Sequence, residues 1–178
     1  MAYFASRGLR GSGFEELINA TNEAYRQKGL ALIQKIPTSI TPIELDNETR
    51  TIKKAYFEKK STVDYLGAVQ GIPVCFDAKE TFQKSFPLKN IHEHQLIFMN
   101  DFALQKGVAF IIIRFAFCDE MFLCTLEMLN EFMSNAKKGG RKSIPYNAFD
   151  RRLLVKQSGL FFVHYLEALN TYLNIKNF

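Results

Sequence analysis

Residues 64–79, DYLGAVQGIPVCFDAK, look like two strands joined by a tight turn at Gln70 and Gly71. A two-residue loop with glycine is a common connection between antiparallel strands. Such a loop also fixes the register, because residue 69 then pairs with residue 72 and each step outward pairs the next two residues. The stretch therefore predicts a β-hairpin in which Asp64 lies directly opposite Asp77.

The second segment of this hairpin places an acid and a lysine on the same face of the sheet. Side chains alternate along a strand, so Asp77 and Lys79 point to one side while Val74, Phe76 and Ala78 point to the other. With Asp64 opposite Asp77, the pattern is an acid, a gap, and then acid-x-lysine. We therefore expect two carboxylates and an ammonium group to meet on one face.

Two facing carboxylates, with Cβ atoms ~4.5–5.5 Å apart, would destabilise the sheet and raise each other's pKa unless a cation lay between them. Mg²⁺ prefers carboxylate oxygens, needs few protein ligands and keeps waters that can attack phosphate. Lys79 would orient that water or stabilise the added negative charge. The group predicts a metal-dependent nuclease, and the alternative is a surface strand with an ordinary salt bridge.

Composition limits the class of protein. The chain has 178 residues, of which 47% are hydrophobic, and this fits a single domain (1–178) with a sizeable core. It carries 23 lysines and arginines against 18 acids, and the net charge of +5 favours an anionic partner. No stretch has the length of a membrane span and no signal-peptide core is visible, so we expect a cytoplasmic protein. Buried, unpaired thiols are expected at Cys75, Cys118 and Cys124.

Helical and strand-like patterns mix along the chain. We expect helices at about 14–28 with Ser12 as cap, at 90–106 with Asn90 as cap, at 126–136, at 146–152 and at 163–173. Further strands are expected at 30–36, 108–117, 121–125 and 153–156. We expect residues 1–13 to form a flexible basic arm and residues 38–61 to form a protruding excursion. This order predicts an α/β fold with a mixed central β-sheet flanked by helices.

Gln95 interrupts an apolar stripe that also contains Ile91, Phe98 and Phe102 on the predicted helix. A polar group on such a face needs a hydrogen-bond partner. An active site would provide one, and the alternative is a core glutamine that bonds to the backbone.

Three cationic groups are candidates for DNA contact, since cations bind phosphate and aromatic rings stack on exposed bases. Taken singly, each group is more often a solvated surface than a binding site. They are Arg7 and Arg10 in the arm; Arg50, Lys53, Lys54, Lys59 and Lys60 with Tyr56 and Phe57 in the excursion; and Lys137, Lys138, Arg141 and Lys142.

Four blocks resemble, in order, the RecU family of bacterial Holliday junction resolvases. They are RGLRGSGFEELINATNEAY (7–25), ALIQKIPTSI (31–40), IKKAYFEKKSTVDYLGAVQGIPVCFDAKET (52–81) and SFPLKNIHEHQ (85–95), and GRKSIPY (140–146) also fits. The resemblance implies a restriction-endonuclease-like core of the PD-(D/E)xK superfamily with a protruding stalk insertion. It also implies a homodimer, dependence on Mg²⁺ or Mn²⁺, and paired nicks across four-way branched DNA in recombination and repair.

Carried over by position, the resemblance assigns roles to single residues. It makes Asp64, Asp77 and Lys79 the nuclease triad, with Asp77 where close relatives more often have glutamate. An aspartate is allowed in the wider class, so the chemistry should survive its shorter side chain. The neighbours of the metal and the attacking water are then Thr62 and Gln95, and Glu15 resembles the glutamate of the first helix in this nuclease class.

The excursion at about 38–61 matches the stalk of the family, which enters the centre of the junction. Its Arg50, Lys53, Tyr56 and Phe57 would then read branch shape. Candidate partners are four-way DNA, a second copy of the chain, and recombinase and branch-migration proteins. The competing functions are a duplex or flap nuclease with the same fold and a junction-binding recombination accessory protein that does not cut. The acid pair argues against the accessory protein, and the stalk argues against the duplex cutter.

Overall fold

The computed structural model describes residues 12–37, 40–57 and 62–176. In these residues the α-helices are α1 (Ser12–Gln27), α2 (Glu93–Leu104), α3 (Leu126–Lys137) and α4 (Tyr165–Lys176). The short 3-10 turns are η2 (Leu88–Asn90), which follows β6 (Ser85–Pro87), η3 (Tyr146–Ala148), which follows β9 (Ser143–Pro145), and η4 (Arg151–Leu153). None of the helices in this described part is long and apolar enough to cross a membrane.

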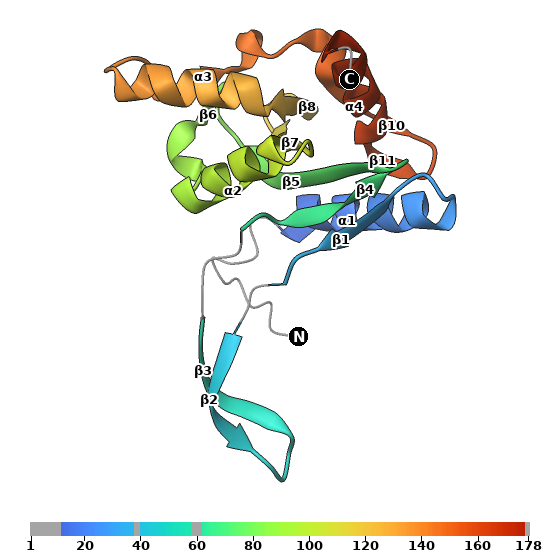
Figure 1. The fold of residues 1–178 in the computed structure, drawn as a ribbon, viewed down its shortest axis with the longest axis vertical. Coiled ribbons are helices and arrows are strands. Elements are labelled where there is room, and N and C mark those ends of the chain that lie inside the picture. The colour runs from blue at the N-terminus through green and yellow to red at the C-terminus, as the bar shows by residue number, and fades with distance from the viewer. Residues whose placement is uncertain (1–11, 38–39, 58–61, 177–178) are drawn as a thin grey trace.

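A mixed seven-stranded sheet with the order β1-β4-β5-β7-β8-β10-β11 forms the centre of the molecule (Figure 1). Neighbouring strands are antiparallel except β5 and β7, which are parallel and joined through β6, η2 and α2. The strands are β1 (Leu32–Lys35), β4 (Tyr65–Val69), β5 (Ile72–Thr81), β7 (Val108–Phe115), β8 (Glu120–Thr125), β10 (Leu154–Ser158) and β11 (Phe161–His164). The predicted mixed sheet with flanking helices is confirmed, and it is consistent with a restriction-endonuclease-like core.

Two apolar clusters cover the two faces of this sheet. Residues of α1 and α4 pack with Val74, Phe76 and Ala78 on one face, while residues of α2 and α3 pack with Cys75 on the other. This division follows from the strand alternation, because successive residues of β5 point to opposite faces. Asp77 shares its strand face with Cys75, so it lies on the side of the sheet covered by α2 and α3.

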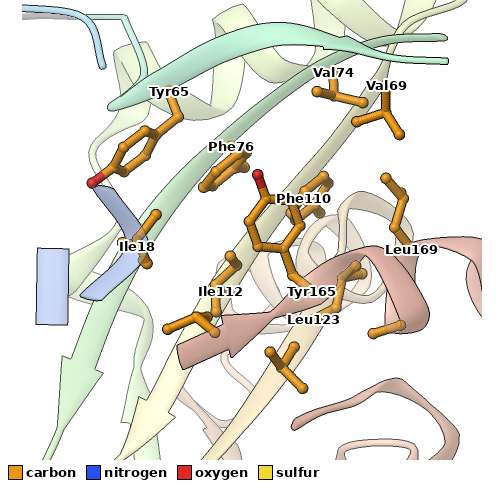
Figure 2. Packing of buried hydrophobic residues seen from close by; sticks show 14 of the residues in the cluster. Ile18, Tyr65, Val69, Val74, Phe76, Phe110, Ile112, Leu123, Tyr165 and Leu169 are labelled. Carbon is orange, nitrogen blue, oxygen red and sulfur yellow. The ribbon is translucent and has the colours of Figure 1, made fainter. Parts of the chain in front are cut away.

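Aromatic rings fill the centre of the first cluster, as Figure 2 shows. Phe76 stacks between Tyr65 and Phe110, with ring centroids 4.7 and 5.0 Å apart, and Tyr165 of α4 packs on it at 5.1 Å. All four side chains are fully buried. These rings fix β4 on β5, and so they hold Asp77, in the interior of β5, beside Asp64, which immediately precedes β4.

The hairpin has the register that the two-residue loop predicts, with Tyr65 opposite Phe76 and Val69 opposite Ile72. Gln70 and Gly71 both have positive φ, 48° and 87°, which is the backbone of the turn type that matches strand twist. Asp64 lies immediately before the first residue of β4. Continuing the register by one pair beyond Tyr65 and Phe76 places Asp64 opposite Asp77.

We expect Gly67→Ala to lower stability sharply, because β1 crosses close to this position of β4. A Cβ atom at Gly67 would lie 2.0 Å from the backbone oxygen of Leu32 and 2.8 Å from Cα of Ile33. Overpacking of this kind costs about 1–3 kcal/mol, so thermal unfolding should show a melting temperature lower by roughly 2–12 °C. The matched variant Gly13→Ala meets nothing within 4 Å and should not lower it; equal losses in both variants would contradict the close approach.

Two short two-stranded sheets lie outside the main sheet. β6 (Ser85–Pro87) pairs with β9 (Ser143–Pro145), and β2 (Ile40–Asp46) pairs with β3 (Thr51–Phe57). The β2–β3 hairpin extends away from the body of the molecule in Figure 1. The sequence predicted an irregular excursion for this segment, and the two strands were missed. Their apolar side chains are exposed, so the sequence does not alternate regularly between apolar and polar residues as a half-buried strand does.

Several local expectations were wrong. Asn90 ends the η2 turn instead of capping α2, which begins after His92. Ser12 is the first residue of α1 and not its cap. Residues 146–152, expected as one helix, contain η3 and the start of η4, and Val163 and His164 belong to β11 rather than to the last helix.

One expectation about the cysteines was also wrong. Cys75 and Cys124 are buried, as expected, but Cys118 is exposed. It lies in the turn between β7 and β8, next to Asp119, whose φ is positive at 53°. The apolar run around Cys118 therefore ends in a surface turn, which removes that thiol from the core.

Candidate functional site

The first two residues of the candidate site, Asp64 and Asp77, meet where β4 begins beside β5. The backbone N–H of Asp64 donates to Oδ1 of Asp77 at 2.8 Å, and the backbone N–H of Ala78 donates to Oδ2 of Asp64 at 3.3 Å. Each aspartate is thus held by the backbone of the opposite strand. The two carboxylates have fixed positions on one edge of the hairpin.

Lys79 completes the group from the same face of β5. Its Nζ lies 3.2 Å from Oδ2 of Asp77 and 3.5 Å from Oδ2 of Asp64. The side chains of Lys79 and Asp64 are 19% and 25% exposed, whereas that of Asp77 is fully buried. The site is therefore a shallow one, with a buried floor and with an acid and a cation that solvent can reach.

Burial sets the electrostatics of Asp77. Desolvation raises the pKa of its carboxyl above the ordinary value of 3.8; Lys79 opposes this rise and the charge of Asp64 adds to it. Among the described residues none donates a hydrogen bond to Oδ2 of Asp77, since Lys79 lies near it without hydrogen-bond geometry. The Lys79 ammonium group at 3.2 Å offsets part of the cost of burying this oxygen, and a bound metal cation would lower that cost further.

The donor set fits Mg²⁺ or Mn²⁺. Both aspartates present hard oxygen ligands, and one of these oxygens has no hydrogen bond to lose. The described residues contain no group of three or more histidines, cysteines or acids that could hold a metal ion. Mg²⁺ commonly binds through one or two carboxylates and completes its shell with water and substrate phosphate.

Comparison with known proteins identifies the family of this chain. The profile of the family described as "RecU: Recombination protein U" matches residues 9–171. The protein named "Holliday junction resolvase RecU" of Geobacillus sp. (strain WCH70) is 44% identical over 148 residues, which cover 81% of this chain and 74% of that protein. The protein of the same name from Lactococcus lactis subsp. cremoris (strain MG1363) is 47% identical over 142 residues, 78% of this chain and 66% of that protein. The chain belongs to the RecU family.

The other predicted site residues of this RecU chain have no described contact with the acid pair. Thr62 is exposed in a bend two residues before Asp64. Gln95 is buried, and its Oε1 accepts from the backbone N–H of His92 at 3.3 Å, which closes a capping box at the start of α2. Gln95 therefore has the backbone partner of the alternative interpretation, and its role beside the metal stays a prediction.

Glu15 on α1 pairs with Lys35 of β1 at 2.6 Å. The backbone oxygen of Glu15 also accepts from the hydroxyl of Tyr65 at 3.4 Å, so the first helix is tied to the residue that follows Asp64. This places Glu15 close to the strand of the site, although its carboxylate is engaged with a lysine. Its catalytic role stays a prediction.

The predicted DNA contacts divide between described and undescribed residues. Arg7, Arg10, Lys59 and Lys60 lie outside the described residues, as does the side chain of Phe57. Arg50, Lys54 and Tyr56 are exposed on the β2–β3 hairpin, and Arg50 has a positive φ of 53° at its turn. Lys53 forms an ion pair with Asp46 across the two strands at 3.3 Å, so its ammonium group is engaged within the hairpin.

Sequence reasoning missed the part played by the backbone of Ala78. Its N–H holds the carboxylate of Asp64, and an alanine side chain gives no sign of such a role. The register of the hairpin could have indicated it, because a residue opposite Asp77 also lies beside the backbone amide of Ala78.

Asp77→Asn is expected to raise the melting temperature at neutral pH without divalent metal. Facing like charges cost about 0.2–1 kcal/mol, which corresponds to roughly 1–4 °C. Because the folded state raises the pKa of Asp77, the folded chain holds this proton more tightly than the unfolded chain, and the wild type loses stability as pH rises through the raised pKa. The two melting curves should converge at acid pH; a gap that is constant with pH would contradict this cause.

Proposed function

We propose that this RecU chain is a metal-dependent endonuclease that resolves four-way DNA junctions. The observation that carries the proposal is the group of Asp64, Asp77 and Lys79, in which a buried carboxylate oxygen lacks a hydrogen-bond donor among the described residues. Relatives named as Holliday junction resolvases support the substrate. The proposal combines a site that fits phosphodiester hydrolysis with a family that fits branched DNA.

Asp64 and Asp77 would hold Mg²⁺ or Mn²⁺ through their Oδ2 atoms. When bound, the metal supplies Lewis-acid stabilisation of phosphate and lowers the pKa of a coordinated water. The Ala78 amide keeps the Asp64 carboxylate in place for this task. Lys79, which now neutralises both acids, would turn its ammonium group to the scissile phosphate and stabilise the negative charge that grows there.

The β2–β3 hairpin would supply the preference for branched DNA. It forms a sheet of its own outside the main sheet, and it exposes Arg50, Lys54 and Tyr56. Cations and an aromatic ring on a projecting element suit the centre of a junction, where phosphates converge and bases are accessible. Paired cuts need two sites related by a twofold axis, so we also propose that the chain works as a homodimer.

The test is nicking of a labelled synthetic four-way junction beside a linear duplex of the same sequence. With Mg²⁺ we expect paired nicks in the junction and little cutting of the duplex, and with a chelator we expect neither. Equal cutting of both substrates would favour a duplex nuclease. Tight junction binding without cutting in Mg²⁺ or Mn²⁺ would favour the accessory protein.

A further inference from the structure

A groove of about 630 Å³ lies between the η2 turn, the β6–β9 pair and the C-terminal part of α3. Its floor is aliphatic and includes Leu88, Ile91, Met133 and Ala136. Leu88 and Ile91 are both 5% exposed, so the groove exposes the edge of the second apolar cluster. The volume is in the range of sites that bind small molecules or peptide side chains.

Three lysines stand at the rim of this groove, namely Lys89, Lys137 and Lys142. All three are exposed, and none forms an ion pair with a described residue. No acid is present among the described residues that line the groove. The positive charge at the rim is thus uncompensated there, and it is complementary to an anionic partner.

The walls of the groove are held from the core. Phe86 of β6 pairs with Ile144 of β9, and both are fully buried. The backbone N–H of Leu88 donates to the backbone oxygen of Lys142 at 3.1 Å, which ties the η2 turn to the residue that precedes β9. Such a surface is pre-organised, so a ligand would lose little free energy in ordering it.

The groove does not end at α3. Met133 and Lys137 also line a neighbouring cleft of about 350 Å³ between α2 and α3, where Leu96 and Ile97 add apolar surface. Glu93 at this cleft is an acid, so the acidic part of a ligand would lie at the lysine rim and not here. Ile97 is 55% exposed. The two hollows together offer room for an extended segment with several side chains rather than for a single anion.

We propose that this lysine-rimmed groove binds an acidic peptide segment with aliphatic anchor residues, carried by a partner protein. Aliphatic anchors would cover Leu88, Ile91 and Met133, and flanking carboxylates would meet the rim lysines. Nucleic acid fits less well, because single strands bind by stacking on aromatic rings and the described lining has none. Phosphate contacts alone would leave the aliphatic floor uncovered. The proposal does not depend on the nuclease activity.

The probe is a short fluorescein-labelled peptide in which three aspartates precede three leucines, titrated with the full chain and followed by fluorescence anisotropy. The control peptide has lysines in place of the aspartates. We expect the acidic peptide to bind at least about tenfold more tightly than the control peptide, and to weaken as salt rises. Absence of saturable binding, or equal binding of the two peptides, would overturn the proposal.

Variants separate the floor from the rim. Ala136→Phe fills the floor, and the double variant K89E/K142E reverses charge at the rim. Each should lower the affinity for the acidic peptide at least about tenfold. The control is Lys156→Glu, which changes an exposed lysine of β10 outside the groove. It should change the affinity for the acidic peptide less than about twofold. The affinity of Ala136→Phe for a four-way junction should remain near wild type, because this variant changes no charge. If K89E/K142E weakens the junction while Ala136→Phe leaves the peptide unchanged, the groove is a DNA surface and the proposal fails.

Discussion

Junction nicking by Asp77→Asn is expected to be slower than nicking by the wild type by about 10³-fold, the upper range for loss of one electrostatic stabiliser at an active site. Asparagine keeps the shape of the side chain and can still accept from the Asp64 amide through its oxygen. It removes the negative charge of the buried oxygen that has no described donor, so the pair loses affinity for Mg²⁺. The measurement is the single-turnover nicking rate on a labelled junction across a range of Mg²⁺ concentrations.

Glu80→Gln is the matched control for this loss. Glu80 is the next acid along β5, but it points to the opposite face and pairs with Arg114 at 3.0 Å. Its neutralisation should change the nicking rate less than about threefold, because a partly exposed ion pair contributes little. Junction affinity without metal should be unchanged or tighter in Asp77→Asn, since a negative charge near the phosphates is gone. A variant of Asp77 that nicks within tenfold of the wild type would remove this residue from the chemistry.

The hairpin that carries Asp77 could be predicted because its information is local. A two-residue loop fixes the register of the strands, and alternation then assigns each side chain to a face. The structure pairs Tyr65 with Phe76 as the turn requires, and Asp64 follows from that pairing one residue further out. This part of the site needed no knowledge of the remaining chain.

The burial of Asp77 could not be predicted in the same way. It depends on β7, which runs parallel to β5 and places Ile111 beside Asp77 in the register. Such non-local pairing is set by the whole sheet. The prediction of Asn90 as the cap of α2 was wrong for a related reason. Ile91 is buried in the core in an extended conformation, so His92 is the cap and the helix begins after it. Asn90 is the better cap by residue type, but tertiary packing decides where the helix begins.

Replacing residues 42–55 with a two-glycine turn is expected to abolish the preference for junctions while duplex nicking and the fold are kept. Thr41 lies opposite Tyr56 in the hairpin, so a two-residue turn can close the shortened strands. β2 and β3 belong to their own sheet, and their removal leaves all strands of the main sheet in place. The ratio of junction to duplex nicking should fall by about 100-fold, equivalent to roughly 2.7 kcal/mol of discrimination.

Point variants distinguish the side chains of the hairpin from its bulk. Tyr56→Ala removes a ring that is 52% exposed, and Lys54→Ala removes a cation that lies opposite Glu44. If the hairpin reads the branch point, each should lower the junction-to-duplex ratio, and Tyr56→Ala should do so with little change in salt dependence because stacking does not release counterions. Ile43→Ser is the control, since it removes an exposed apolar side chain without changing charge. If the shortened chain still prefers junctions, the hairpin is not the element that recognises the branch, and the body of the molecule that carries Asp64 and Asp77 must do so.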